Sequence, residues 1–149
     1  MNIRIATGIA RRGEAILLVA SRYANHPEPL WTLPGGRQEP RELAAETVAR
    51  EVREETGLDA TVGDLAYASE SYDGETHVAN LTFIIAVEGE PRAPVGHDHV
   101  VAAEWVPIAQ LGERMHIAVV RNPLLAYLGG SPCRYYGFHD AGVTIRWFS

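Results

Sequence analysis

Residues 36–58 read GRQEPRELAAETVAREVREETGL, and six acidic residues fall between Glu39 and Glu55. Alanine, glutamate and arginine are good helix formers, so the composition of this stretch predicts a helix from Glu42 to Thr56. Pro40 stands just before the predicted helix, where its fixed φ favours a helix start. Gly57 stands where a left-handed C-cap usually falls. The stretch therefore predicts one short, bounded helix with a high density of carboxylates.

Two kinds of side chain separate on this helix when its residues are placed at about 100° intervals. The carboxylates of Glu51, Glu54 and Glu55 fan over an arc of roughly 100°. Beside them runs a face of small apolar residues that can pack close to a sheet, made of Ala45, Val48, Ala49 and Val52. Neighbouring carboxylates repel one another unless a cation neutralises them, and Mg²⁺ binds proteins through a few carboxylates, water and substrate phosphates. The helix is therefore a candidate metal-binding element.

A plainer interpretation is a solvated helix face held by salt bridges. Glu46, Arg50 and Glu54 are spaced by four residues, and each such pair contributes about 0.3–0.5 kcal/mol. Charged runs usually decorate exposed faces, so composition alone favours this second interpretation.

The spacing of particular residues changes that balance. Gly36 is followed by five residues and Glu42, and then by seven residues and the run from Arg50 to Leu58. This pattern resembles the Nudix box, which ends in Arg-Glu-aliphatic-any-Glu-Glu-any-Gly-aliphatic, and no required position departs from it. The preceding Leu33-Pro34-Gly35 is also typical of that family. The resemblance implies a hydrolase of a nucleoside diphosphate linked to another moiety, dependent on Mg²⁺ or Mn²⁺.

The resemblance also implies a set of metal ligands. Glu51 and Glu55 would be the main ligands, and Glu54 would bind the metal directly, bind it through water, or polarise the nucleophile. The backbone carbonyl of Gly35 would be a further ligand, because paired glycines leave no side chain to crowd it.

The same resemblance assigns further roles around the helix. Arg50 together with Glu42 would brace the preceding loop against the helix. Gly36 and Arg37 would contact the substrate, and Arg22, at the end of a predicted strand, would touch its phosphates unless it is an ordinary surface arginine. The catalytic residues expected on this basis are Glu54, Glu51, Arg50 and Asp98.

Asp98 is included because Nudix hydrolases often carry an extra carboxylate on the loop before a strand that ends in Trp-Val-Pro, here residues 105–107. That carboxylate serves as a general base or an additional metal ligand. Glu104 is the second candidate, and the imidazole of His99 could also accept a proton near neutral pH. The identity of the base stays open at this point.

Composition narrows the class of protein. The net charge of −6 argues against binding to nucleic acid, for which a basic face is expected. All 13 basic residues are arginines, which excludes catalytic lysines of the P-loop, kinase and Schiff-base kinds. The single cysteine, Cys133, excludes an internal disulfide framework. No apolar run approaches a membrane span and the segment after Met1 does not resemble a signal peptide, so we expect a cytoplasmic protein with no membrane partner.

The rest of the chain predicts strands around the helix. Apolar runs and alternation indicate strands at residues 3–10, 15–21, 31–33 and 100–107, and a long hairpin over residues 60–88 with its turn at Asp73-Gly74. A second helix is expected over Met115–Leu128, where Pro123 would either kink it or mark a fresh start. These elements predict one α/β domain over residues 1–149, and the resemblance to the Nudix family implies that it is an α/β/α sandwich with a mixed β-sheet.

Two features concern partners and substrate entry. The tail is expected to add strands at residues 133–138 and 142–148, as an edge hairpin that covers the core or contacts a second copy, so a homodimer is plausible. On the predicted hairpin, Tyr67, Tyr72 and His77 fit either the substrate end or half-exposed strand positions.

The nucleotide substrate is not determined by these residues. A nucleoside triphosphate, unmodified or oxidised, giving a nucleoside monophosphate and pyrophosphate, is favoured because ADP-ribose hydrolases of the family are commonly longer at the N-terminus. Alternatives are ADP-ribose or another nucleotide sugar, a dinucleoside polyphosphate, and a different class altogether, a non-catalytic module that senses a nucleotide.

Overall fold

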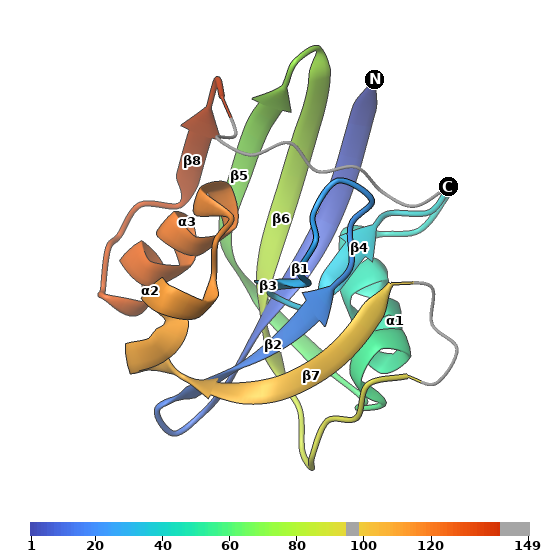
Figure 1. Ribbon diagram of the computed structural model, residues 1–149, viewed down its shortest axis with the longest axis vertical. Helices are drawn as coiled ribbons and strands as arrows, with labels where there is room; N and C mark the ends of the chain where they lie inside the picture. The colour runs from blue at the N-terminus through green and yellow to red at the C-terminus, as the bar shows by residue number, and fades with distance from the viewer. Residues whose placement is uncertain (95–98, 141–149) are drawn as a thin grey trace.

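The computed structural model describes residues 1–94 and 99–140, and Figure 1 shows a strongly twisted sheet with helices on both sides. The strands are β1 (Asn2–Arg12), β2 (Ala15–Ser21), β3 (Leu30–Thr32), β4 (Gly35–Arg37), β5 (Thr61–Asp73), β6 (Thr76–Ala86), β7 (Val100–Pro107) and β8 (Tyr135–Phe138). The helical elements are α1 (Ala44–Thr56), the 3-10 turn η1 (Ile108–Gln110), α2 (Leu111–Arg114) and α3 (Ala118–Leu128).

Strand β1 lies at the centre of the sheet because it has partners on both sides. Along one side it pairs in parallel with β6 from Asn2 to Ala10. Along the other side it pairs antiparallel with β4 over residues 5–7 and with β2 over residues 11–12. The resulting order is β3-β2-β1-β6-β5-β8, with β4 beside β1 and β7 beside β2. Parallel and antiparallel pairs occur in one sheet, so the predicted mixed sheet is confirmed.

The predicted hairpin is present as β5 and β6. Asp73 pairs with Thr76, and the two residues between them make the turn, where Gly74 has a φ of +60°. A left-handed φ at this position favours glycine, which is why the Asp-Gly pair is a strong hairpin signal.

Helix α1 begins at Ala44, two residues later than predicted. Glu42 instead lies before the helix, where its carboxylate accepts hydrogen bonds from Thr47 and Arg50. Leu43 takes the N-cap position, and its N–H donates to the Glu46 carboxylate at 2.9 Å. The predicted end is confirmed, because Gly57 caps the helix with a φ of +76°.

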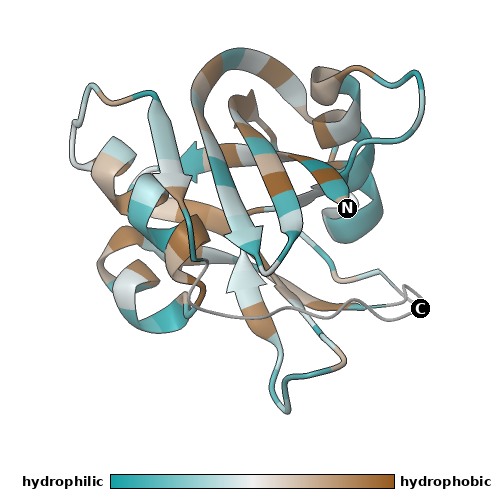
Figure 2. Ribbon diagram, turned by 90° about the horizontal axis from the view of Figure 1, so that it is seen from above, coloured by the Kyte–Doolittle hydropathy of each residue, from teal (hydrophilic) through white to brown (hydrophobic). Residues whose placement is uncertain are grey.

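Strand β2 is buried on both faces and separates two apolar clusters. Leu17 faces α1, and the members of that cluster are Ala6, Ala10, Leu17, Val48, Val52 and Ile85. Ile16 and Leu18 face the other way, toward a larger cluster that includes Leu111, Met115 and Leu124 from the second helical layer. Figure 2 shows the corresponding alternation of brown and teal along the N-terminal strand β1. Helices therefore cover both faces of the sheet, as expected for the α/β/α sandwich.

The second major helix is present as α3, but it begins later than predicted. It begins at Ala118, since Met115 and Ile117 have extended backbones and their side chains are buried. Pro123 lies inside one continuous helix, so of the two alternatives, a kink or a fresh start, the fresh start is wrong. Pro123 is buried beside Leu124, and this packing holds the helix together although proline lacks an N–H for the helical ladder.

Two short strands arise by pairing with distant partners. Gly35–Arg37, expected as a loop, becomes β4 against β1. The tail strand β8 pairs in parallel with β5, so its place in the sheet does not depend on a hairpin; residues 142–148 lie outside the described residues. Among the helices that the structure describes, none has the length and apolar character needed to cross a membrane.

The larger cluster generates a stability prediction. Leu124 is fully buried and Leu43 is 69% exposed. Leu124→Ala should lower the free energy of unfolding by about 2–5 kcal/mol, because it removes buried methyl groups and leaves a cavity. Leu43→Ala, the matched control, should change it by less than about 0.5 kcal/mol. Urea denaturation followed by circular dichroism measures both, and equal effects of the two substitutions would contradict the assignment of this core.

Candidate active site

The three carboxylates that were expected to bind metal are buried to different depths on α1. Glu55 is 2% exposed, whereas the side chains of Glu51 and Glu54 are 14% and 47% exposed. Glu51 and Glu55 are one helical turn apart and lie against β4, while Glu54 is turned toward solvent. The protein therefore holds two of the carboxylates in place and leaves the third accessible.

Strand β4 brings its backbone directly against these carboxylates. The N–H of Gly35 donates to Oε1 of Glu55 at 2.9 Å. Gly35 has a φ of +154°, and a Cβ on it would lie 2.2 Å from the carbonyl oxygen of Ala6. A Cβ on Gly36 would lie 2.6 Å from Cδ of Glu51. The backbone therefore approaches its neighbours closely at the glycine pair, and a side chain at either position would displace one of them. The Gly35 carbonyl as a metal ligand stays a prediction.

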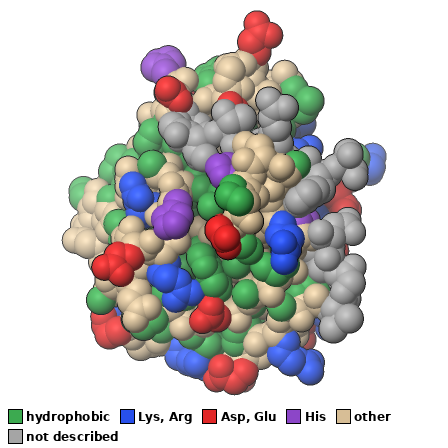
Figure 3. Space-filling view, in the orientation of Figure 1, with side chains coloured by type: hydrophobic (Ala, Val, Ile, Leu, Met, Phe, Trp, Pro, Cys, Tyr) green, Lys and Arg blue, Asp and Glu red, His purple; other side chains and the backbone are tan. Residues whose placement is uncertain are grey.

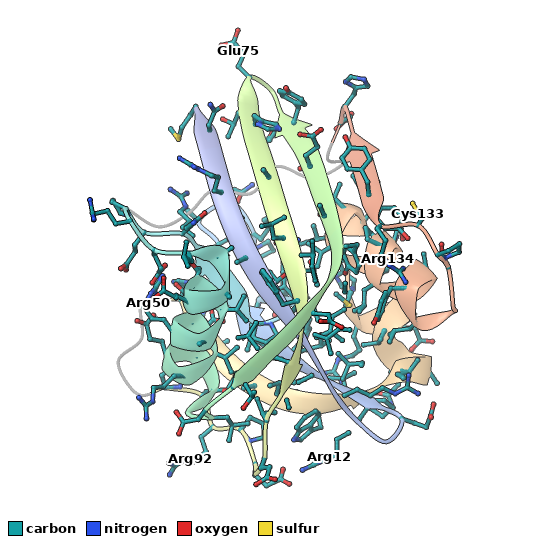
Figure 4. The ribbon with its side chains drawn as sticks, turned by 180° about the vertical axis from the view of Figure 1, so that it is seen from behind. Arg12, Arg50, Glu75, Arg92, Cys133 and Arg134 are labelled. Atoms are coloured by element: carbon teal, nitrogen blue, oxygen red, sulfur yellow. The ribbon has the colours of Figure 1, made fainter. Side chains whose placement is uncertain are left out.

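Arg50 joins the helix to the loop that precedes it. Its Nε and Nη2 donate to the two carboxylate oxygens of Glu42 at 2.8 and 3.0 Å, and Nη2 also donates to the carbonyl of Arg37 at 3.1 Å. Its Nη1 donates to Glu51 at 2.8 Å and lies 3.3 Å from Glu54. Figure 4 shows Arg50 on the flank of α1 that faces away from the centre of the sheet. The predicted brace of Arg50 and Glu42 is confirmed.

The alternative ladder of salt bridges on this helix is present only in part. Arg50 and Glu54 form the expected pair. Glu46 instead accepts the hydrogen bond of the Leu43 N–H at the helix start. Arg50 therefore interacts mainly with Glu42 and Glu51. The interpretation of this face as a solvated ladder of salt bridges accounts only for its pair with Glu54.

The surroundings shift the pKa values of these carboxylates in opposite directions. Hydrogen bonds from Arg50 are the largest cause that lowers the pKa of Glu42, from 4.5 to about 2. Burial raises the pKa of Glu51 in spite of the hydrogen bond from Arg50. Burial, with the nearby charge of Glu51, raises the pKa of Glu55 well above 4.5. Burial therefore disfavours the charged forms of Glu51 and Glu55, and a divalent cation would stabilise those forms.

The oxygen atoms of these carboxylates and of the Gly35 carbonyl suit such a cation, although they do not yet converge on one point. Within residues 1–94 and 99–140, no three acidic, histidine or cysteine side chains already converge on one point. Arg50 donates a hydrogen bond to Glu51, and the Gly35 N–H donates one to Glu55. The two glutamate side chains must therefore rotate before they can bind one ion together. The ligands on offer are all oxygens, which Mg²⁺ and Mn²⁺ prefer, and two of them belong to carboxylates that burial has destabilised. The residues present therefore fit a hard divalent cation.

A cleft of about 330 Å³ opens beside Glu55. One wall is the face of β1, β5 and β6, and another is the segment 117–120 at the start of α3, together with Tyr23. Most of the lining is apolar, with contributions from Ile3, Ile5, Val78, Ile117 and Val120. On the face drawn in Figure 3, hydrophobic side chains gather toward the middle with charged ones around and among them. The size and the apolar lining are typical of small-molecule sites.

The three residues expected to contact substrate lie in different places. Gly36 and Arg37 line the cleft beside Glu55. Arg22 is not among the described residues that line it; its side chain is exposed, and its N–H donates to the carbonyl of His99 at 2.8 Å. Arg37 is therefore brought to the site, whereas Arg22 stands between the cleft residues Ser21 and Tyr23 with its own side chain exposed.

The candidates for the general base are also separated. His99 lines the cleft, while Asp98 lies outside the described residues. Glu104 accepts a hydrogen bond from Arg114 at 3.0 Å and is not among the cleft residues that the structure describes. His99 is thus the candidate that the described part of the chain brings to the cleft.

Of the hairpin aromatics, Tyr67 lines the cleft. The rings of Tyr72 and His77 contact each other instead, with centroids 4.9 Å apart. Alternation along β5 explains the difference, because residues 67, 69 and 71 share one face and residue 72 belongs to the other.

The cleft also contains Tyr23 and Asn80, which the sequence did not identify as site residues. Tyr23 is 5% exposed, and burial, with the charge of Glu55, raises its pKa to about 12. Asn80 faces the cleft from β6 and is hydrogen-bonded to Thr7 and Thr82. Alternation along β6 was the available signal for Asn80, whereas nothing in the polar loop that follows β2 distinguished Tyr23.

The pair of Glu42 and Arg50 predicts a pH-dependent stability. The folded-state pKa of Glu42 is lowered from 4.5 to about 2, so the pair stabilises the fold above pH 4.5 and this contribution is lost as the pH falls toward 2. Glu42→Gln should cost about 2 kcal/mol at pH 6, less than the full shift implies because the pair is partly hydrated. The difference between the two proteins, measured by urea denaturation, should shrink steadily below pH 4.5. A difference that is constant from pH 6 to pH 3 would refute this account of the brace.

Comparison with known proteins adds independent evidence. An ADP-ribose pyrophosphatase of Methanocaldococcus jannaschii is 39% identical over 84 residues, which are 55% of this chain and 49% of that protein. A CTP pyrophosphohydrolase of Escherichia coli is 37% identical over 62 residues, 42% of this chain and 46% of that protein. The matches span about half the length of these curated relatives.

The fold has a counterpart among solved structures, and the family model covers most of the chain. The solution structure of the Escherichia coli ORF135 protein superimposes with a TM-score of 0.71 at 26% sequence identity, over 88% of this chain and 94% of that one. The model of the NUDIX domain matches residues 2–128, a span that contains the carboxylate helix, the glycine pair and the cleft strands. The chain therefore belongs to the Nudix family.

Proposed function

We propose that this protein is a metal-dependent pyrophosphohydrolase that cleaves a phosphoric anhydride bond in a nucleoside diphosphate linked to another moiety. The single observation that carries the proposal is the position of Glu55, a carboxylate with a raised pKa, at the edge of a largely apolar cleft of about 330 Å³. A cleft of this kind suits a nucleoside, and the carboxylates beside it suit a cation that binds the attached phosphates.

Glu51, Glu54 and Glu55 would hold Mg²⁺ or Mn²⁺, with the Gly35 carbonyl as a further ligand. When bound, the metal would neutralise phosphate charge and lower the pKa of a water nucleophile. The acidic net charge of −6 supports this assignment, since an acidic protein needs cations to bring anionic phosphates to its carboxylates.

The residues around the carboxylates would position them and the substrate. Arg50 holds Glu51 and the Arg37 carbonyl in place through hydrogen bonds of 2.8 and 3.1 Å, so it would act by positioning the metal ligands. Gly36 and Arg37 would contact the phosphates, and Arg22 would reach them from the rim. Asp98 or His99 would accept the proton of the attacking water.

Other uses of the fold have less support. Every glutamate of the box is present, which favours catalysis over a sensor that only binds a nucleotide. An isomerase on this scaffold would need a catalytic cysteine near the cleft. In Figure 4, Cys133 lies across the sheet from Arg50, on the side of β8.

Within the enzyme class we favour a nucleoside triphosphate, unmodified or oxidised, as the substrate. The relatives include both a CTP pyrophosphohydrolase and an ADP-ribose pyrophosphatase, so ADP-ribose is the second candidate. Attack at the α-phosphorus of a triphosphate would release a nucleoside monophosphate and pyrophosphate.

Glu51→Gln and Glu54→Gln should each fold normally and lower turnover by more than about a hundredfold, because each removes one charge from the metal-binding set. Product release from a mixed nucleotide panel with Mg²⁺ measures this loss. Mn²⁺ binding, followed by electron paramagnetic resonance, should weaken in Glu51→Gln and gives a readout that does not depend on turnover.

Glu46→Gln is the matched control on the same helix. Glu46 accepts the Leu43 N–H, and glutamine can make the same cap, so both turnover and Mn²⁺ binding should stay near those of the unsubstituted protein. Turnover close to wild type in Glu51→Gln or Glu54→Gln would remove these residues from the metal site.

The identity of the products should separate the substrate classes. Incubation of nucleoside triphosphates with Mg²⁺ should release the monophosphate and pyrophosphate in equal amounts, as resolved by ion-exchange chromatography. Diphosphate and phosphate would instead mean attack at the β-phosphorus. Cleavage of ADP-ribose alone would replace the triphosphate assignment, and nucleotide binding without cleavage under either metal would indicate the sensor.

A further inference from the structure

We propose that Asn80 reads the base of the substrate and selects bases that present an amino hydrogen over bases that present a carbonyl oxygen at the same position. The inference rests on the proposed function, because it takes the nucleoside to lie in the cleft with its phosphates near Glu55. It goes further by naming the class of base and the residue that selects it.

The sheet places Asn80 at a suitable distance from the carboxylates. Gly35, which binds Glu55, is opposite Thr7 on β1, and β1 in turn pairs with β6, where Asn80 is opposite Ile5. Neighbouring strands are about 4.8 Å apart, and Asn80 lies two residues along β6 from Thr82, the residue that is opposite Thr7, so roughly 12 Å separates Gly35 from Asn80. A nucleotide with its phosphates beside Glu55 would therefore extend along the cleft toward Asn80.

Asn80 lies where polar and apolar residues of the cleft lining meet. Its neighbours along the same face are Val78 and Thr82 on β6, Ile5 on β1 and Ser69 on β5, and the apolar side chains of Ile117 and Val120 line the cleft from the start of α3. The apolar side chains exclude water from this part of the cleft. A base that cannot hydrogen-bond with the amide therefore binds much more weakly than one that can, since the polar atom left without a partner costs its full desolvation.

A network beneath the cleft holds the amide in one orientation. Nδ2 of Asn80 donates to Oγ1 of Thr82 at 2.9 Å and to Oγ of Ser69 at 3.4 Å. Thr7 donates from Oγ1 to Oδ1 of Asn80 at 3.2 Å, and Oγ1 of Thr7 lies 2.9 Å from Oγ1 of Thr82. Thr82 is fully buried and also hydrogen-bonds with Tyr67, so the base of the network is closed to solvent.

Counting the hydrogen-bonding capacity of Asn80 shows what remains for a ligand. An asparagine amide has two N–H donors and two acceptor positions on its oxygen. Both donors are used by Thr82 and Ser69, and one acceptor position is used by Thr7. The capacity left for a ligand is one acceptor position on Oδ1.

An acceptor in an apolar cleft favours a donor on the substrate. The exocyclic amino groups of cytosine and adenine are such donors, whereas uracil and hypoxanthine carry a carbonyl oxygen at the corresponding position and would set two acceptors against each other. CTP against UTP, and ATP against ITP, are therefore near-isosteric pairs that differ in the group that Asn80 would contact.

The test measures kcat/KM for both pairs and, separately, the Kd of CMP and UMP by calorimetry. We expect a preference of roughly tenfold or more for CTP over UTP and for ATP over ITP, the loss expected for an unmatched hydrogen bond. CMP should bind more tightly than UMP by a similar factor. Asn80→Leu, similar in size, should bring each ratio close to one by weakening the amino-bearing member.

Two further variants make the test specific. Asn80→Asp keeps an acceptor and should keep the preference. Asn122→Leu makes the same Asn-to-Leu change at an exposed position on α3, outside the cleft-lining residues, and should leave every ratio unchanged. If Asn80→Leu does not fold, Asn80→Asp decides, and a folded Asn80→Asp protein without the preference overturns the inference.

The outcomes separate this inference from the proposed function. Hydrolysis of all four triphosphates at equal rates, or a preference for UTP and ITP, overturns base selection by Asn80 and leaves the pyrophosphohydrolase intact. Tighter binding of CMP than UMP without hydrolysis of any nucleotide overturns the proposed activity and supports the base selection. Wild-type ratios in folded Asn80→Leu overturn the role of Asn80, and absence of both hydrolysis and CMP binding overturns both proposals.

Discussion

The guanidinium of Arg50 lies between α1 and the loop that follows β4, and it donates hydrogen bonds to both. It neutralises Glu42, holds Glu51 and Glu54 on the same flank, and fixes the Arg37 carbonyl. Without this cation, the neighbouring carboxylates of the helix would repel one another, and the loop that carries Glu42 would lose its hydrogen bonds to the helix. Glu55 is the exception, since it is buried on the other side and bound by the Gly35 N–H.

A second constraint comes from the central position of β1. Because β1 pairs with β4 on one side and β6 on the other, it links the glycine pair at the carboxylates to the strand that carries Asn80. The close approach of Gly35 to Ala6 and Thr7 fixes how near the two halves of the site can come. The carboxylates and the cleft residues are therefore held by neighbouring strands of one sheet. The strand spacing and register set the distance between Gly35 and Asn80.

Much of the carboxylate site could be predicted from the sequence. The box residues are close together along the chain and share one helix and its loop, so local geometry already brings Glu42 to Arg50 and orders Glu51, Glu54 and Glu55 around the axis. The helix start was placed two residues early, because the turn of Glu42 toward Arg50 depends on side-chain hydrogen bonds. The sequence did not decide between a kink and a fresh start at Pro123, because the burial of Pro123 inside α3 depends on tertiary packing.

The sequence by itself determined the mixed α/β architecture, the buried β2, the hairpin of β5 and β6 and the helix with its glycine cap, because periodicity and capping act over a few neighbouring residues. Only the tertiary structure decided that Gly35–Arg37 is a strand, that β8 pairs with β5, and that Tyr23, Asn80 and His99 meet in one cleft with Glu55. Those residues are far apart along the chain, and their meeting depends on which strands pair and which face each side chain takes. Strand pairing across long separations is a property of the whole sheet, and no short stretch of sequence specifies it.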